Sequence, residues 1–174
     1  MATDTKTETD NIKTKYSSVF GISGDADDNV GYIGTIVDDT YNAYWIICAI
    51  SGNTYYLFPM RNLGTHRMNP TDTTEGGYYK SEMYTYVHNT VLPNLRKSGL
   101  NIIACNLVSK DLYRSIVSRT LMTSGTITDG EPFWLTDTAS SVEFYNVYKD
   151  GSIYNNHRAS KSLGVRPLIT VVKD

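Results

Sequence analysis

The stretch of sequence that decides the fold lies in the last third of the chain. It reads Phe-Trp-Leu-Thr-Asp (133–137), Val-Glu-Phe-Tyr-Asn-Val-Tyr (142–148), Lys-Asp-Gly-Ser (149–152), Tyr-Asn-Asn-His-Arg (154–158) and Gly-Val-Arg-Pro-Leu-Ile-Thr-Val-Val (164–172). Aromatic and β-branched residues favour strands, and an Asp-Gly pair is a strong hairpin signal. We therefore predict one connected β unit: a strand with Trp134, an aromatic strand turning at 149–152, a polar loop, and a closing strand.

Further strands are predicted upstream of this unit. Residues 30–37 read as a first strand, and the continuous apolar run at 43–50 is typical of a strand covered on both faces. A turn at 51–53 leads into a hairpin partner at 54–58, which ends at a proline. Residues 102–108 form another short strand candidate.

One segment carries a strong helical pattern. Ser81 is a capping residue, and apolar side chains recur at four-residue spacing at Met83, Val87, Val91 and Leu95. Pro93 should kink this helix or start a second piece. We expect a main helix at about 81–97 packed on a sheet, and either a short helix or a mixed loop at 111–122. The predicted class is α+β, with mostly antiparallel short strands and irregular loops.

The first residues predict an arm. Residues 1–15 have almost no apolar content and no periodicity, so they bury too little surface to offset their ordering entropy. We expect an extended N-terminal arm at 1–16, held by a neighbouring subunit, and a domain at 17–174. The acidic loop at 25–29 begins like a calcium loop, but Val30 and Ile36 stand where an EF-hand needs Gly and Glu. This favours a solvated acidic loop.

Composition narrows the class of protein. A formal net charge of -2 over 174 residues argues against nucleic-acid binding, which needs a basic face. No apolar run approaches the roughly 20 residues of a membrane span, and no signal peptide pattern is present. The 14 tyrosines are far above ordinary usage and favour half-buried strands and contact surfaces. Cys48 and Cys105 lie in apolar runs, which favours two buried thiols over the alternative of a disulfide.

Patterns that carry catalysis are absent from the sequence. His66, His88 and His157 form no metal-binding spacing, and there is no nucleophile elbow, phosphate loop or dinucleotide fingerprint. We therefore expect a non-enzymatic protein with no cofactor and no metal.

Surface chemistry is what remains. Flat amphipathic rings, amides and a guanidinium gather along the hairpin and polar loop, at Tyr145, Tyr148, Tyr154, Asn155, Asn156, His157 and Arg158. Rings stack on the apolar faces of sugars while amides bind hydroxyls, so this mixture is typical of carbohydrate or protein contact. An ordinary hairpin with a polar loop is the alternative interpretation.

The chain resembles a family of bacterial and phage domains related to the sulfatase-modifying branch of the C-type lectin fold. The resemblance covers about 44–174. Its C-terminal signature matches at Phe133-Trp134-Leu135, Tyr145-Asn146-Val147, Asp150-Gly151-Ser152, Asn155-Asn156, Ser160 and Gly164-Val165-Arg166-Pro167. Further upstream, the similar residues are Gly76-Gly77-Tyr78, Ser81-Glu82-Met83-Tyr84 and Val91-Leu92-Pro93. Phe133 and Thr136 stand where the family has Trp and Arg.

The resemblance implies a C-type-lectin-like domain on the non-enzymatic side of the family. Nothing around Cys48 or Cys105 resembles the catalytic cysteine arrangement of the formylglycine-generating enzymes. Phage members look like virion proteins, so we expect a capsid decoration protein on the particle exterior. It would be made in the host cytoplasm and bind other virion proteins through residues 1–16. The alternative is a tail adhesin that binds a cell-surface glycan or host receptor through 145–158. The resemblance gives structural roles to Trp134, Asp150, Gly151, Gly164, Arg166 and Pro167.

Overall fold

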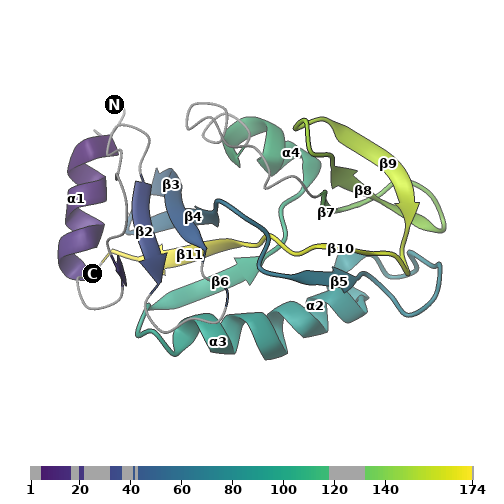
Figure 1. The fold of residues 1–174 in the computed structure, drawn as a ribbon, viewed down its shortest axis with the longest axis horizontal. Coiled ribbons are helices and arrows are strands. Elements are labelled where there is room, and N and C mark those ends of the chain that lie inside the picture. Colours follow the sequence, from purple (N-terminus) through teal and green to yellow (C-terminus); the bar gives the residue numbers. More distant parts are fainter. Residues whose placement is uncertain are drawn as a thin grey trace.

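A computed structural model of the chain describes residues 5–16, 20–21, 32–36, 41, 43–117 and 132–173. Among these residues the strands form two sheets (Figure 1). The larger sheet is antiparallel throughout and has the order β1 (Phe20–Gly21), β2 (Tyr32–Ile36), β3 (Tyr44–Ser51), β4 (Thr54–Pro59), β11 (Leu168–Val172) and β6 (Ile102–Asn106).

The smaller sheet contains most of the C-terminal stretch. Its order is β5 (Thr65–Arg67), β10 (Ser162–Gly164), β7 (Phe133–Thr138), β8 (Glu143–Val147) and β9 (Ile153–Arg158). Its described pairs are antiparallel except for β10 with β7. The predicted α+β class with mostly antiparallel strands is confirmed.

The hairpin β3–β4 forms where the apolar run predicts it. Its turn contains Gly52, whose φ of 55° lies in the left-handed region that glycine adopts without a Cβ penalty. Trp45, Ile46 and Ile47 are buried in succession, Trp45 in one hydrophobic core and Ile46 in a second. This half of β3 is therefore covered on both faces, as predicted.

The main helix consists of α2 (Glu82–Tyr86), a π-helical turn (Val87–Val91) and α3 (Leu92–Arg96), and it runs along β6 (Figure 1). The Ser81 hydroxyl accepts the Tyr84 N–H at 3.1 Å and caps the helix. Pro93 has no N–H for the preceding turn, and the helix widens into the π turn just before it. The predicted helix at 81–97 and its second piece are confirmed.

A second short helix follows β6. It comprises α4 (Lys110–Leu112) and a π-helical turn (Tyr113–Val117), with Tyr113 and Val117 buried in the second core. The helical alternative at 111–122 is thus confirmed as far as Val117. Residues 118–122 lie outside the described residues, as does the acidic loop at 25–29.

Two expectations for the C-terminal stretch are wrong. Residues 154–158, predicted as a polar loop, form most of β9, because pairing with β8 outweighs the weak strand propensity of Asn and His. The closing strand is also two strands, since the chain leaves the smaller sheet at Gly164 and enters the larger one at Leu168. A strand pattern shows pairing tendency but not which sheet provides the partner.

The junction between the two sheets is built around a buried arginine. The Arg166 guanidinium lies against the rings of both Phe58 and Phe133, with its carbon 5.2 and 5.1 Å from the two ring centroids. Its Nε donates to the Pro59 carbonyl at 2.9 Å. Arg166 therefore joins the end of β4 to the start of β7 through its donor fork and planar face.

The expected extended arm is wrong for residues 5–15, which form the helix α1 (Thr5–Lys15) against β2 (Figure 1). Ile12 and Tyr16, one helical turn apart, are buried in the main core. The Tyr16 hydroxyl donates to the Val172 carbonyl at 2.8 Å, and Lys173 Nζ lies 3.0 Å from Glu8 Oε2. These partners come from the far end of the chain, so local composition does not reveal them. The division of the chain at residue 16 stays a prediction.

The Glu8 carboxylate connects α1 to the last strand electrostatically. Burial alone would raise its pKa, but hydrogen bonds from Lys173, Tyr55 and Asn11 and the Lys173 charge hold the pKa of Glu8 below its ordinary value. The ionised form of Glu8 therefore stabilises the folded state.

Candidate functional site

The two faces of the β8–β9 hairpin divide the predicted binding residues. Asn146 pairs with Tyr154 and Val147 with Ile153, and cross-strand partners share a face. Val147 lies in the second hydrophobic core, with Tyr145 packed against it. Tyr148 and Tyr154 lie on the opposite face, where their rings meet edge to face with centroids 5.2 Å apart.

Tyr145 is therefore separated from the other predicted residues. Its ring is half-buried and carries the Lys110 ammonium, whose nitrogen lies 3.9 Å from the ring centroid. This contact fixes the hairpin to the start of α4. The structure assigns Tyr145 to packing rather than to an open surface.

Arg158 and His157 both interact with other residues of the protein, Arg158 from a side chain that is 68% exposed. Arg158 lies 3.7 Å from Asp72, whose other carboxylate oxygen accepts the Ser160 N–H and hydroxyl. Those two hydrogen bonds, followed by the Arg158 charge, hold the pKa of Asp72 below its ordinary value against the opposing effect of burial. Burial lowers the pKa of His157, and the charge of Lys161 lowers it further, so His157 is neutral at neutral pH.

Of the remaining predicted residues, three are exposed on the edge strand β9, and the half-buried Tyr148 directly follows β8. Tyr154 is 41% exposed, and Asn155 and Asn156 are exposed beside it. We call Tyr148, Tyr154 and Asn156 the hairpin surface; Asn155, which lies between Tyr154 and Asn156 along β9, projects from the other face of the strand. The two rings of the hairpin surface and the Asn156 amide are the part of the predicted site that the structure brings together.

A buried amide organises this surface. Asn146 is fully buried, and its Nδ2 donates to the Tyr154 carbonyl and to Asn156 Oδ1, both at 3.3 Å. The hydrogen bonds fix the Asn156 side chain and the backbone that carries the Tyr154 ring. Sequence reasoning did not assign Asn146 a role at the site. Its signal is a polar residue between the buried Phe144 and Val147 of one strand.

The residues of the structural signature shape the hairpin and its supports. Gly151, with φ of 87°, forms the tip beside Asp150, whose carboxylate accepts the Ser152 N–H at 2.9 Å. Trp134 is buried and its Nε1 donates to the His66 carbonyl at 3.0 Å. Gly164 is required by close packing, because a Cβ there would lie 2.0 Å from Asn62 Nδ2. Pro167 is buried at the junction between the sheets.

The histidines and cysteines occupy structural positions. His66 stacks on Tyr86 with ring centroids 4.1 Å apart, and its Nε2 lies 3.5 Å from a Glu82 oxygen. Both cysteines are thiols, as favoured from the sequence, but Cys105 is buried whereas Cys48 is half-buried. Burial raises the pKa of Cys105 to about 12 against the opposing charge of Arg96. Within the described ranges, no three His, Cys, Asp or Glu side chains are grouped as metal ligands, and no helix is long and apolar enough to span a bilayer.

Comparisons with known proteins add no relative: no family model, no curated protein and no solved structure matches the chain.

Proposed function

We propose that this protein is a non-enzymatic virion surface protein with a lectin-like domain, which binds neutral carbohydrate through the hairpin surface. The observation that carries the proposal is the pair of tyrosine rings, Tyr148 and Tyr154, beside the Asn156 amide, which the buried Asn146 holds in place. Tyrosine rings pack on the apolar faces of sugars, and amides donate to and accept from hydroxyls.

Pre-organisation supports a binding role for this surface. The Tyr148 ring restrains the Tyr154 ring, and the Asn146 amide restrains Asn156, so little side-chain freedom is lost when a ligand binds. The side chains of the hairpin surface are themselves uncharged, which suits neutral sugars; at its border Arg158 lies 3.7 Å from Asp72, and the Lys149 ammonium lies 5.7 Å from the Tyr148 ring centroid. The α+β arrangement of two sheets with one main helix is compatible with the lectin-like fold that the resemblance implies.

Of the two proposed roles, the N-terminal helix favours the adhesin over the capsid decoration protein. The decoration hypothesis relied on residues 1–16 as an extended anchor, yet Ile12 and Tyr16 are buried in the domain. A segment that packs on its own domain has less surface for a capsid subunit. Decoration remains a second hypothesis, and immunogold labelling of purified particles distinguishes head from tail.

A glycan array probed with labelled full-length protein tests the proposal. We expect binding to a subset of neutral glycans, and we expect Tyr154→Ala to weaken it by about 10-fold. The matched control is Tyr44→Ala, which removes a tyrosine ring that is 39% exposed on β3 of the other sheet. The proposal that the hairpin surface binds carbohydrate is refuted if the wild-type protein binds no glycan on the array. It is also refuted if both variants lose binding equally.

A further inference from the structure

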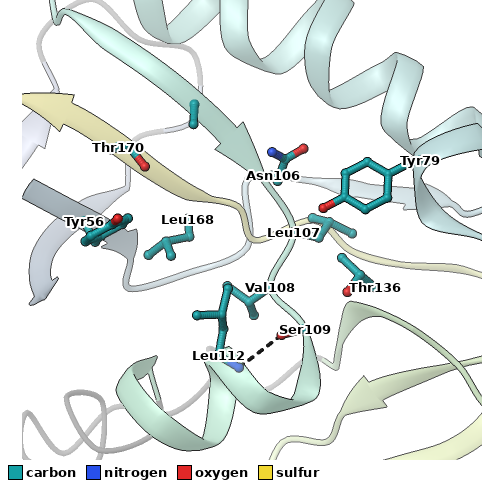
Figure 2. A pocket seen from close by; sticks show the side chains of 11 residues that line it. Tyr56, Tyr79, Asn106, Leu107, Val108, Ser109, Leu112, Thr136, Leu168 and Thr170 are labelled. Atoms are coloured by element: carbon teal, nitrogen blue, oxygen red, sulfur yellow. Dashed lines mark hydrogen bonds between the residues drawn. The ribbon is translucent and has the colours of Figure 1, made fainter. Parts of the chain in front are cut away.

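A second candidate site lies between the two sheets, on the side of β11 that faces α4 (Figure 2). It is a cleft of about 240 Å³. Its walls come from β4, β6 and β11 of the larger sheet and from β7 of the smaller one, with α4 along one side. Tyr56 and Tyr79 stand at opposite ends of the cleft (Figure 2).

The lining of the cleft is uncharged. Hydroxyl groups come from Tyr56, Tyr79, Ser109, Thr136 and Thr170, and the floor consists mainly of leucine and valine side chains. An ionic ligand would lose its hydration here without gaining an opposite charge, which is costly. A neutral ligand with many hydroxyls can exchange hydrogen bonds with this lining while it covers the apolar floor.

The amide of Asn106 is fixed with its donor available to the cleft. The buried Tyr78 hydroxyl accepts the Leu107 N–H at 3.3 Å and donates to Asn106 Oδ1 at 3.1 Å. The amide oxygen is thereby engaged, and Nδ2 is the atom left to donate. No other hydrogen bond of the Asn106 side chain is present among the described residues.

Several hydroxyl groups of the lining also have a donor proton or an acceptor lone pair left for a ligand. Ser109 Oγ accepts the Leu112 N–H at 3.1 Å and retains its own proton as a donor (Figure 2). Thr136 Oγ1 donates to Asp137 and retains lone pairs as acceptors. Thr170 projects from the middle strand of this wall, between its register partners Tyr56 and Ala104. Donors and acceptors therefore surround a small apolar floor.

We infer that this cleft binds a single neutral pyranose ring. Pockets for drug-sized ligands occupy roughly 300–1,000 Å³, so a cleft of about 240 Å³ suits a smaller molecule. The two tyrosines stand at opposite ends rather than facing each other, so they form no flat slot for a nucleobase. The site is separate from the hairpin surface and stands whether or not that surface binds carbohydrate.

Amide chemical shifts of the 15N-labelled full chain, titrated with methyl glycosides of glucose, galactose, mannose and N-acetylglucosamine, test the inference. We expect at least one of these probes to shift the amides of 104–109 and 168–170 in a saturable way below about 20 mM. Methyl glucuronide, which adds a carboxylate to the same kind of ring, is the charged control ligand. Thymidine is the nucleoside control ligand. Both should shift these amides less than the neutral probe does.

Two variants locate the contact. Thr170→Val keeps the shape of the side chain and suits a strand, and we expect it to raise the Kd for the best probe by about 3- to 10-fold. Asn106→Asp keeps the acceptor for Tyr78 but replaces the cleft donor, and we expect at least about 10-fold weaker binding. If either variant fails to fold, Tyr79→Phe removes a hydroxyl from a ring that is 68% exposed.

Tyr154→Ala is the control, and it should leave the cleft shifts unchanged even if it weakens binding at the hairpin surface. The inference is overturned if none of the neutral probes shifts the cleft amides, or if shifts appear only at 153–157. Equal or tighter binding of methyl glucuronide or thymidine, or an unchanged Kd in the cleft variants, also overturns it.

Discussion

Substitution of Ile12 by Ala tests whether the N-terminal helix is part of the folded domain. Ile12 is fully buried in the main core. Truncation of a buried Ile or Leu to Ala typically costs about 2–5 kcal/mol, which combines lost transfer free energy with the cavity that is left. The neighbouring Asn11 and Thr14 are exposed, so α1 lies at the surface and its surroundings can relax. We therefore expect a loss at the lower end, about 2–3 kcal/mol.

Urea unfolding followed by tryptophan fluorescence measures this loss. The midpoint should fall with an unchanged slope, and the Tm should drop by about 4–12 °C for a chain of this size. Thr14→Ala, at an exposed position of the same helix, should change stability by less than about 0.5 kcal/mol. An Ile12→Ala midpoint equal to that of the wild type would mean that the helix does not pack on the domain, and the arm hypothesis would return.

Three further predictions concern reactivity, pH dependence and packing. Because burial raises the pKa of Cys105 to about 12, an alkylating reagent at about pH 8 should label Cys48 first and Cys105 only after unfolding; equal rates would contradict this. The lowered pKa of Glu8 contributes stability that is present above its unfolded pKa and is lost as the pH falls through its folded pKa. Glu8→Gln should therefore lower the urea midpoint at pH 7 but much less at about pH 3, and an equal deficit at both pH values would exclude this role. Gly164→Ala places a Cβ 2.0 Å from Asn62 Nδ2 and should cost about 1–3 kcal/mol in thermal or urea unfolding, whereas an unchanged midpoint would show that Asn62 moves aside freely.

Local sequence patterns predicted the individual elements well. The apolar run at 43–50, the stripe from Met83 to Leu95 and the Asp-Gly turn each depend on neighbours within a few residues. Pro93 acts on its own helix through its missing N–H, so its effect could also be predicted. These features need no knowledge of distant partners.

Long-range pairing explains what could not be predicted. Residues 5–15 form a helix whose contacts include Val172 and Lys173, and 154–158 form a strand because β8 lies beside them. The two halves of the closing segment belong to different sheets, which depends on packing around Arg166. Neither composition nor periodicity contains this information.

The candidate site follows the same division. Aromatic and amide residues near the hairpin were predicted by type, but strand register decided that Tyr145 lies on the other face and that Arg158 pairs with Asp72. The cleft combines residues from four strands and a short helix that are distant in sequence. Only the folded chain shows that Asn106 and Thr170 share it.

Calorimetric titration of the strongest glycan from the array into three proteins tests the central claim most directly. The proteins are the wild type, Tyr154→Ala and Tyr44→Ala. Loss of one stacked ring should weaken binding by about 10-fold, so we predict this increase in Kd for Tyr154→Ala and an unchanged Kd for Tyr44→Ala. An unchanged Kd in Tyr154→Ala would contradict carbohydrate recognition at the hairpin surface.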